Sequence, residues 1–283
     1  MQLVAISDDD LRDSFGIGVA GNFAGHLEQA GEDRDFIAVA ASPAAPKGIF
    51  PFYARAATNY LADYPISSTR IAWTTVGDLQ IEPELAVICS IDYDATGLAT
   101  SLKPQTAAAF NDCSARRPNA DKISEKKNWG ADSKGLAARG FAVDEIERDG
   151  ATSSLRLACF LRRNSTVSTY GVDSAVADYS YYGAQLLDWI VDRLRLQRDE
   201  AGSPLEDVGA LLAACGLPTS IVIGIGATRY TPFGESNFLR PGDQSIVVAY
   251  DSGAHSAQAI RSAVVAGDES ALDDASVLSQ VVG

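Results

Sequence analysis

Two glutamates separated by one residue stand at the start of an apolar segment. Glu82, Pro83 and Glu84 are followed by the run LAVICSI at positions 85–91. In a β-strand, side chains at positions i and i+2 leave the same face, so both carboxylates can reach one cation. Two close carboxylates in apolar surroundings resist ionisation unless a positive charge neutralises them. Oxygen ligands suit Mg²⁺, Mn²⁺ or Ca²⁺ rather than a metal that prefers thiolates. The pattern therefore indicates a site for a hard cation, and a solvated strand end is the alternative.

Side chains suited to acid–base chemistry are few. His26 and His255 are the two histidines of the chain, so an imidazole base must be one of them. Asp112 and Arg116 lie four residues apart with small residues between them, a spacing that can place an acid and a base around one ligand. Lys134 follows in a segment punctuated by glycines. Each of these residues alone also fits a structural role, as a hydrogen-bonded histidine, a turn or a solvated lysine.

A glycine motif near the N-terminus invites comparison with nucleotide-binding proteins. Gly16, Gly18 and Gly21 satisfy the pattern G-x-G-x-x-G. The dinucleotide-binding form requires a hydrophobic strand directly before the first glycine and a helix that opens at the third. The preceding segment DDDLRDSF is not an apolar strand, and residues 22–25 make a poor helix start. The context therefore disfavours a nicotinamide-binding function.

Length and composition limit the class of protein. The chain has 283 residues, of which 46% are hydrophobic and 21% charged, and its formal net charge is −14. These values are typical of a globular protein with a sizeable core. An acidic chain lacks the basic field that a nucleic-acid backbone requires, so we expect no nucleic-acid partner. No run approaches about 18 apolar residues, and residues 1–15 lack the features of a secretory signal. The four cysteines are scattered, which is typical of a chain that keeps its thiols reduced. Together, these features predict a cytoplasmic protein without a membrane partner.

Strand-like runs dominate the first two-thirds of the chain, and helices are expected later. The runs are rich in β-branched or aromatic residues and are bounded by Gly, Pro or Asp. They are Leu3–Ile6, Ile17–Ala20, Phe36–Ala41, Arg70–Val76, Glu84–Ile91 and Leu155–Leu161. Apolar spacing predicts a helix over Asp178–Arg198. A second helix is predicted over Ser203–Gly216, where Ser203 can cap the helix and Glu206 completes a capping box. Residues 116–140 are polar and predict a long surface loop. The elements predict an α+β, strand-rich single domain with a helical segment near 178–216 and an acidic tail at 262–283.

Taken in order, six short motifs resemble those of the fumarylacetoacetate hydrolase superfamily. The matches run from about residue 15 to 255, so they cover nearly the whole chain, and they include both acidic motifs. They are GNFAGH (Gly21–His26), PKGIFPF (Pro46–Phe52), EPELAVI (Glu82–Ile88), NDCSAR (Asn111–Arg116), WGADSKG (Trp129–Gly135) and FLRPGD (Phe238–Asp243). Each motif is weak alone, and the collinear order of all six makes the resemblance fairly specific.

The resemblance implies a fold and a metal. The fold would be the mixed β-sandwich roll of this superfamily, usually found as a homodimer. Glu82, Glu84 and Asp112 would be the ligands of Mg²⁺ or Mn²⁺, with Ca²⁺ as a third choice. A divalent cation chelated by a 2-oxo acid or 1,3-dicarbonyl compound polarises the carbonyl and stabilises the developing enolate. The partner would thus be a small oxo acid.

The resemblance also implies roles for the side chains around the metal. His26 would be the general base, and Arg116 and Lys134 would bind carboxylate or enolate oxygens of the substrate. Positively charged groups aimed at the same developing charge add electrostatic stabilisation. The further substrate contacts that match the family's pattern are Asn22, Phe23 and Thr228.

Departures from the family's pattern affect the catalytic groups. Many members carry a glutamate three residues after the histidine, where this chain has Gln29. Glu28 and Glu32 are the neighbouring carboxylates that can substitute for it, and Glu28 is our candidate for this catalytic role. The family's G-T-P turn appears here as Gly226-Ala-Thr228, so its threonine is either missing or displaced by one residue. Lys134 lies one residue further from Trp129 than in the usual pattern. The metal ligands are thus retained, whereas the histidine–glutamate dyad is altered.

Three function classes follow from this pattern. The leading hypothesis is a metal-dependent enzyme that hydrolyses a C–C bond of a small oxo acid or decarboxylates it. The altered dyad favours a second reading, a tautomerase, isomerase or hydratase, because such reactions need no fully activated water. The third is a catalytically silent ligand-binding protein that keeps the scaffold.

Overall fold

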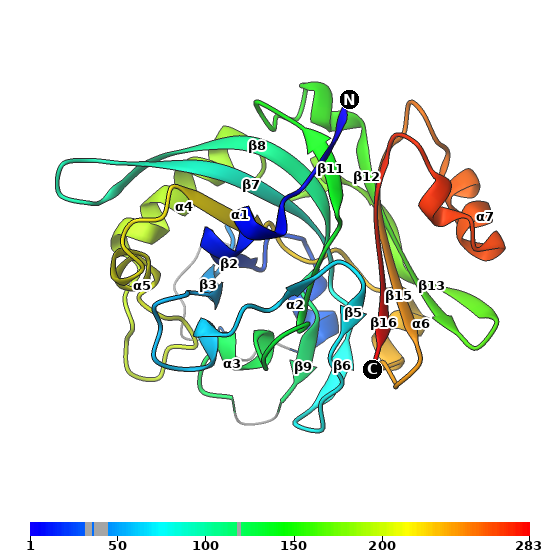
Figure 1. Cartoon of the computed structure of the whole chain (residues 1–283), viewed down its shortest axis with the longest axis horizontal. Coiled ribbons are helices and arrows are strands. Elements are labelled where there is room, and N and C mark those ends of the chain that lie inside the picture. The colour runs from blue at the N-terminus through cyan, green and yellow to red at the C-terminus, as the bar shows by residue number, and fades with distance from the viewer. Residues whose placement is uncertain (32–35, 37–44, 118–119) are drawn as a thin grey trace.

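A long antiparallel hairpin forms the spine of the larger sheet. The computed structural model describes residues 1–31, 36, 45–117 and 120–283. The hairpin pairs β7 (Pro83–Tyr93) with β8 (Ala99–Asn111), and its tip projects from one side of the molecule (Figure 1). β7 contains a predicted strand, whereas β8 is not among the predicted strands. Alanine is a weak strand former, and Pro104 cannot donate to a ladder. Pro104 is accommodated because it lies opposite Cys89, next to a shift in register.

The larger sheet has nine strands, and the hairpin lies in its middle. Seven strands follow the order β1-β11-β8-β7-β14-β2-β3, while β10 pairs with β8 and with β4. Its remaining strands are β1 (Leu3–Ala5), β2 (Phe15–Ala20), β3 (Gly48–Tyr53), β4 (Ile66–Ser67), β10 (Lys134–Leu136), β11 (Arg139–Ala142) and β14 (Ser220–Gly224). Strands distant in sequence thus meet in one sheet, since β14 pairs with both β7 and β2.

A second sheet of five strands packs against the larger one, and the main hydrophobic core lies between them. Its order is β13-β12-β15-β16-β5, and a two-stranded ribbon pairs β6 with β9. These strands are β5 (Arg70–Ile71), β6 (Asp78–Gln80), β9 (Ser114–Arg116), β12 (Leu155–Arg163), β13 (Thr166–Ala175), β15 (Gln244–Asp251) and β16 (Ala275–Val282). The prediction of an acidic tail over 262–283 is wrong, because β16 pairs with β15 along its length and alternate side chains are buried.

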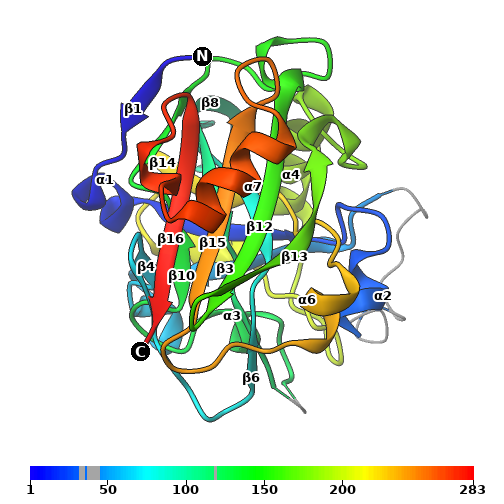
Figure 2. The same ribbon diagram turned by 90° about the vertical axis from the view of Figure 1, so that its right-hand side faces the viewer.

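Helices lie at the edges and outer faces of the sheets. The helices are α1 (Asp8–Asp13), α2 (His26–Ala30), α3 (Ser124–Lys127), α4 (Ala184–Leu196), α5 (Val208–Ala214), α6 (Pro232–Ser236) and α7 (Ala257–Ala266). Short 3-10 turns occur at Tyr60–Ala62, Ala151–Ser154, Val176–Asp178 and Glu269–Ala271. α4 packs on β8, and α7 covers the outer face of the five-stranded sheet (Figure 2). The predicted strand-rich α+β class is confirmed.

Among the predicted strands, those at β1, β2, β7 and β12 are present with small differences in their ends. The predicted strand Arg70–Val76 is shorter in the structure, because only Arg70–Ile71 pair with a neighbour, at the end of β16. The predicted strand Phe36–Ala41 lies outside the described residues apart from Phe36. Most of the predicted runs therefore correspond to strands of the structure, and tertiary pairing decided their lengths.

The helical predictions are right for α4 and need correction elsewhere. α4 lies inside the predicted range Asp178–Arg198. The second helix begins four residues later than its capping pattern predicts, because Asp207 caps α5 by accepting a hydrogen bond from the Ala210 N–H at 2.9 Å. Glu206, the residue expected to complete the capping box, is buried instead and accepts a hydrogen bond from Ser124.

The segment 116–140 is not a surface loop in the part that the structure describes. It contains α3 and β10, and Lys127 and Lys134 within it are buried. These lysines can be buried because each ammonium group forms an ion pair with a buried carboxylate. Polarity alone therefore predicted the wrong environment for this segment.

The glycines of the G-x-G-x-x-G pattern serve packing within β2. A Cβ atom on Gly16 would lie 2.3 Å from the ring of Phe52, and one on Gly18 would lie 2.2 Å from the ring of Phe50. Both glycines therefore make room for aromatic rings of the adjacent strand β3. Gly16 and Gly18 lie inside a strand rather than at a strand-to-helix turn, so the structural context of a dinucleotide site is missing here.

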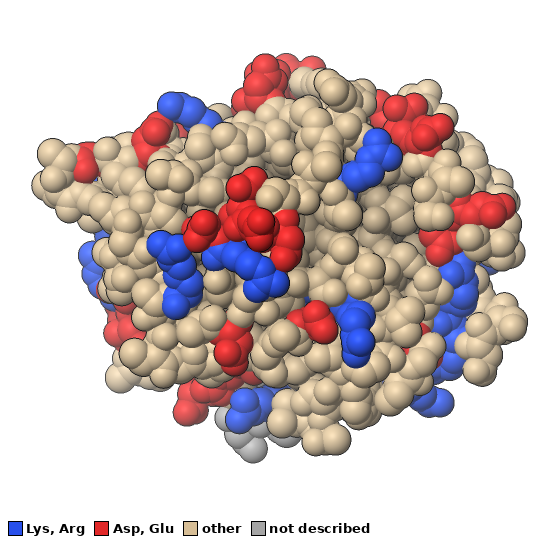
Figure 3. Space-filling model, viewed as in Figure 1, with Lys and Arg blue, Asp and Glu red and all other residues tan. Residues whose placement is uncertain are grey.

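Charges of both signs are interspersed on the face shown in Figure 3. The acidic first turn of α1 forms the group of carboxylates near its centre, and cations lie beside it. Asp8 pairs with Arg12 at 3.0 Å, and Asp13 pairs with Arg55 at 2.7 Å. Among the helices of the described residues, none is both long enough and apolar enough to cross a bilayer.

Candidate metal centre and active site

The register of the β7–β8 hairpin brings together three carboxylates that are distant in sequence. Pro83 pairs with Asn111 at one end of the ladder. Glu82 therefore lies beside Asp112, whose N–H donates to the Glu82 carbonyl oxygen at 3.0 Å. Glu84 leaves the chain on the same face as Glu82, as the i, i+2 spacing predicts. Carboxylate oxygens of the three residues lie within 4.8 Å of one another, and all three side chains are buried.

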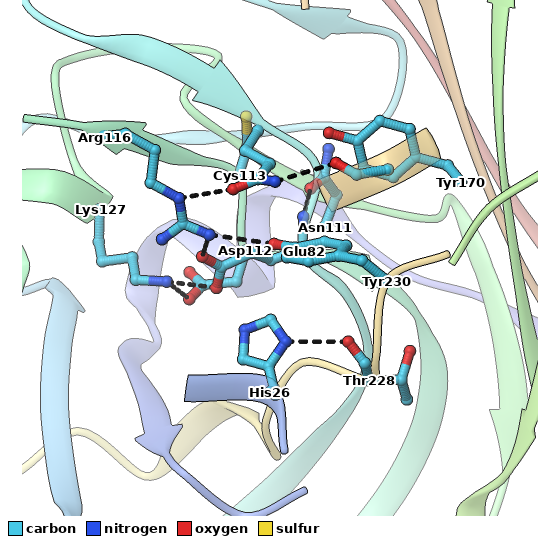
Figure 4. A network of polar contacts seen from close by, with 12 residues as sticks. His26, Glu82, Asn111, Asp112, Cys113, Arg116, Lys127, Tyr170, Thr228 and Tyr230 are labelled. Atoms are coloured by element: carbon cyan, nitrogen blue, oxygen red, sulfur yellow. Dashed lines mark hydrogen bonds and ion pairs between the residues drawn. The ribbon is translucent and has the colours of Figure 1, made fainter. Parts of the chain in front are cut away.

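Three cations surround the carboxylates. Figure 4 shows two of them, Arg116 and Lys127, and Lys127 contacts both Glu82 and Asp112. Lys127 Nζ is 2.5 Å from Glu82 Oε2 and 2.6 Å from Asp112 Oδ2. Arg116 Nη2 lies 2.8 Å from Glu82 Oε1, and Lys134 Nζ lies 3.2 Å from Asp112 Oδ1. The structure thus brings the predicted residues Arg116 and Lys134 to the carboxylates. It adds Lys127, which the sequence analysis did not select.

The positive charge is distributed unevenly over the cluster. Burial raises the pKa of Glu84 well above its usual range, and the nearby Asp112 carboxylate raises it further. Burial would also raise the pKa of Glu82, but the Lys127 and Arg116 cations outweigh it and hold that pKa below the usual range. Glu84 is therefore the carboxylate whose charge is least compensated by the surrounding side chains.

The donor set fits a hard divalent cation. Mg²⁺ takes oxygen ligands at about 2.0–2.1 Å, so oxygens around one ion lie within about 4 Å of each other, close to the spread of this cluster. Glu82 Oε1 and both carboxylate oxygens of Asp112 have no aligned hydrogen bond among the described residues, although they take part in ion pairs. These oxygens are thus neutralised by nearby positive charges rather than by well-aligned hydrogen-bond donors. The chain therefore has a buried Glu/Asp cluster able to bind a divalent metal.

His26 lies beside this cluster in a defined orientation. It is the first residue of α2, and its ring lies below the carboxylates of Glu82 and Asp112 in Figure 4. His26 Nδ1 is 2.9 Å from the Thr228 carbonyl oxygen. Because a carbonyl oxygen only accepts, Nδ1 carries the proton and Nε2 carries the lone pair in the neutral ring. The predicted general base thus has the tautomer in which Nε2 can accept a proton.

The residues near His26 do not form a histidine–glutamate dyad in the described part of the chain. Gln29 is tied to the backbone of Tyr230, since its Oε1 accepts from the Tyr230 N–H at 2.9 Å and its Nε2 donates to the Tyr230 carbonyl at 3.2 Å. The Glu28 side chain is exposed, so the structure does not bring this candidate catalytic residue into the buried cluster. Glu32 lies outside the described residues.

The three predicted substrate contacts have structural partners in the fold, and two of them involve the loop after β14. Asn22 donates to the Ile225 carbonyl at 2.8 Å and to the Tyr181 carbonyl at 3.0 Å. The ring of Phe23 packs edge-on against another aromatic ring at a centroid distance of 5.2 Å. Thr228 is buried, and its carbonyl oxygen is the partner of His26. The Thr228 contact therefore orients the base, and the polar groups of Asn22 are occupied by backbone partners.

Two residues outside the sequence prediction orient Arg116. Its Nε donates to Gln80 Oε1 at 2.7 Å, and its Nη2 donates to the Tyr230 hydroxyl at 3.0 Å. Gln80 in turn donates to the Gly234 carbonyl at 3.0 Å. Neither residue lies in a motif with a chemical signature, so only the fold reveals their role in holding the guanidinium against Glu82.

A small cavity reaches the cluster. It has a volume of about 20 Å³, which is room for about one water molecule. Its polar lining consists of His26, Glu82, Glu84, Asp112 and Lys127. Carboxylates, an imidazole and an ammonium group thus line one small cavity, an arrangement suited to acid–base chemistry beside a bound cation.

A comparison with known protein families identifies the family of the chain. The model described as "Family of unknown function (DUF5718)" matches residues 32–282. The chain belongs to this family. No curated protein matches the DUF5718 chain, so solved structures are the remaining source of comparison.

The DUF5718 chain shares its fold with several solved structures at low sequence identity. A putative HpcE protein from Mycobacterium smegmatis is 15% identical with a TM-score of 0.55, covering 98% of this chain and 77% of that one. A 2-keto-3-deoxy-D-arabinonate dehydratase in its apo form is 13% identical with a TM-score of 0.51, covering 99% and 81%. Cg1458 with an inhibitor is 13% identical with a TM-score of 0.50, covering 95% and 76%. The predicted resemblance to the fumarylacetoacetate hydrolase superfamily is thereby confirmed for the fold.

Proposed function

We propose that this protein is a divalent-cation-dependent enzyme that acts on a small 2-oxo acid or 1,3-dicarbonyl compound. The observation that carries the proposal is the buried cluster of Glu82, Glu84 and Asp112 beside His26. Mg²⁺ or Mn²⁺, with Ca²⁺ as a third choice, would be held by the three carboxylates and would polarise a substrate carbonyl. The name of one fold neighbour, a 2-keto-3-deoxy-D-arabinonate dehydratase, supports a 2-oxo acid as the substrate class.

Side chains of the chain supply the remaining chemistry. The Arg116 guanidinium is fixed by its hydrogen bonds to Gln80 and Tyr230, so it can pair with a substrate carboxylate without losing much side-chain entropy. The buried Lys134 ammonium provides a second positive charge, which counts for more in a dry site than in water. His26 would take or return a proton at Nε2.

The partner of His26 favours proton transfer over hydrolysis. A carboxylate at Nδ1 would stabilise the imidazolium that forms when the ring deprotonates water, whereas the partner here is the neutral Thr228 carbonyl. We therefore favour isomerisation, tautomerisation or dehydration, in which the base moves a proton next to an already polarised carbonyl. C–C bond cleavage is the second candidate, and decarboxylation is its more compatible form because it requires no activated water.

Metal binding is the first test. We expect titration calorimetry to show one Mg²⁺ or Mn²⁺ per chain, with binding lost in Glu82→Ala/Glu84→Ala and weakened at least tenfold in Glu84→Gln. The exposed Glu235→Gln is a charge-matched control and should bind like wild type. A wild-type protein that binds neither ion would remove the metal from the proposal.

The reaction class is tested by NMR with a panel of 2-oxo acids in D₂O. Exchange of the protons next to the carbonyl, or loss of water, indicates proton-transfer chemistry, whereas a shorter carbon chain indicates C–C cleavage. His26→Asn is the sharpest variant, because the asparagine amide can still donate to the Thr228 carbonyl while Nε2 is removed. We expect it to bind metal normally and to lose turnover. Metal binding without turnover across the panel would favour a silent ligand-binding protein.

Two further proposals concern the context of the enzyme. We propose a cytoplasmic location, which the four free and buried cysteines support. We also propose a homodimer without a nucleic-acid or membrane partner. Analytical ultracentrifugation tests the dimer, and a sedimentation coefficient of a monomer at micromolar concentration would contradict it.

A further inference from the structure

The ammonium group of Lys127 occupies the position of a counter-ion inside the carboxylate cluster. Its Nζ contacts one oxygen of Glu82 and one of Asp112 at 2.5 and 2.6 Å. The three side chains are at most 3% exposed. Lysine is almost never buried to this extent unless its charge is paired. The folded chain thus brings its own cation to these carboxylates.

The two oxygens that bind Lys127 belong to the set that would hold a divalent cation. The cavity at the cluster has room for about one water molecule. A metal ion bound by the same carboxylates would therefore lie close to the ammonium group, and the two positive charges would repel each other at short range with little water between them. Lys127 in its present position and a metal ion cannot share the cluster favourably.

The position of Lys127 at the end of a short helix would allow its ammonium group to leave the carboxylates. The carboxylates are fixed by the β7–β8 ladder, whereas Lys127 is the last residue of the four-residue helix α3. Its ammonium group is carried by a flexible four-carbon stem. The ammonium nitrogen also lies over the ring of Phe50, 5.2 Å from the ring centroid. Withdrawal of the ammonium group would therefore leave the three carboxylates in place.

We propose that Lys127 is a tethered competitor of the divalent cation, so that the protein is folded and neutralised at this cluster without metal, and metal binds when the ammonium group withdraws. The inference rests on the proposed function in one respect, the presence of a divalent cation in the working enzyme. It assigns to Lys127 a role in setting metal affinity, which is separate from substrate binding and from proton transfer.

Removal of the ammonium group tests the proposal. Titration calorimetry with MnCl₂ is carried out on wild type, Lys127→Met and Lys126→Met. Methionine keeps most of the apolar stem, and Lys126 is the neighbouring lysine of the same helix, so its variant controls for the change in net charge. We expect Lys127→Met to bind Mn²⁺ at least tenfold more tightly than wild type, and Lys126→Met to bind within about twofold of wild type.

Thermal unfolding supplies a second readout that needs no substrate. In EDTA, Lys127→Met should unfold at a lower temperature than wild type, because its buried carboxylates have lost a counter-ion, and Mn²⁺ should restore it. The wild type should respond much less to EDTA. Where Lys127→Met does not fold, Lys127→Gln replaces it, because glutamine keeps a hydrogen-bond donor without the charge.

The outcomes separate this inference from the proposed function. Equal or weaker Mn²⁺ binding by both Lys127 variants would overturn the role of Lys127, and wild-type metal binding would still support the proposed function. Metal binding by a Lys127 variant but not by wild type would support competition by Lys127 and remove the metal requirement from the proposed function. If no variant and no wild type binds Mn²⁺, both are overturned.

Discussion

A buried carboxyl outside the candidate site makes stability depend on pH. Glu206, between α4 and α5, is only 9% exposed. Its Oε1 accepts a hydrogen bond from Ser124 Oγ, which also lies 2.7 Å from the Tyr60 hydroxyl. Its Oε2 has no hydrogen-bond partner within the described ranges. Burial raises the pKa of Glu206 to about 7, while the Ser124 hydrogen bond and the Lys122 ammonium lower it and Asp199 raises it.

The direction of the effect follows from the two protonation states. The pKa of Glu206 is about 7 in the folded protein, against an ordinary value of 4.5. Between these values the folded state holds a proton that the unfolded state releases. The contribution of this group to the free energy of unfolding is therefore fully present at low pH and is lost as the pH rises through about 7. At about 1.4 kcal/mol per pH unit, the full loss is about 3 kcal/mol.

Glu206→Gln isolates this contribution, because glutamine resembles the protonated side chain and does not titrate. The assay is urea unfolding of both proteins from about pH 5 to about pH 8.5. We expect the difference in free energy of unfolding to change by about 2–3 kcal/mol over this range, in favour of the variant at high pH. Ser124→Ala removes a hydrogen bond that lowers the pKa of Glu206. In this variant, the loss of stability should therefore occur at a higher pH than in the wild type. A difference that stays constant within about 0.5 kcal/mol would refute the reasoning.

Two further substitutions test the interpretation of sequence motifs. Gly18→Ala should lower the free energy of unfolding by about 1–3 kcal/mol in urea titrations, because the new methyl group overlaps an aromatic ring. An unchanged free energy of unfolding would contradict a packing role for this glycine. A titration of the wild type with NAD(H) should show no binding. Gln29→Glu should cost about 1–2 kcal/mol, because it loses the hydrogen bond to the Tyr230 carbonyl. It should not raise turnover, and a rise would show that a carboxylate at this position reaches the histidine.

The carboxylate cluster was the most predictable part of the site. The i, i+2 spacing of Glu82 and Glu84 is a local property, and a strand turns it directly into a shared face. Asp112 could be added only through the resemblance, because the register that places it beside Glu82 depends on pairing with β8. That strand was itself missed, since its alanines and its proline carry no strand signal. Local patterns thus located the ligands, and tertiary pairing brought them together.

Lys127 and Glu206 were misjudged for a shared physical reason. Each stands in a polar stretch, where a charged side chain is normally solvated or caps a helix. In the structure each is buried because a distant segment supplies its partner: Glu82 lies 45 residues from Lys127, and Ser124 lies 82 residues from Glu206. Such partners leave no periodic or local trace in the sequence. A family alignment of charge pairs would be the signal able to find them.

The carboxylates and the cations of the site lie on different kinds of element, which is the feature that the proposed exchange of Lys127 for a metal ion would use. The carboxylates lie on or beside strands of a ladder that ends at the pair Pro83 and Asn111, and Asn111 is itself held by a hydrogen bond to Gln280 at 3.1 Å. The surrounding cations come from elements of three or four residues, β9, α3 and β10. Exchange of Lys127 for a metal ion would therefore move one side chain and leave the carboxylates in place. A preorganised anionic site of this kind can bind a cation without reorganising the backbone. Under the proposed exchange, the competing ammonium group of Lys127 would therefore set most of the metal affinity.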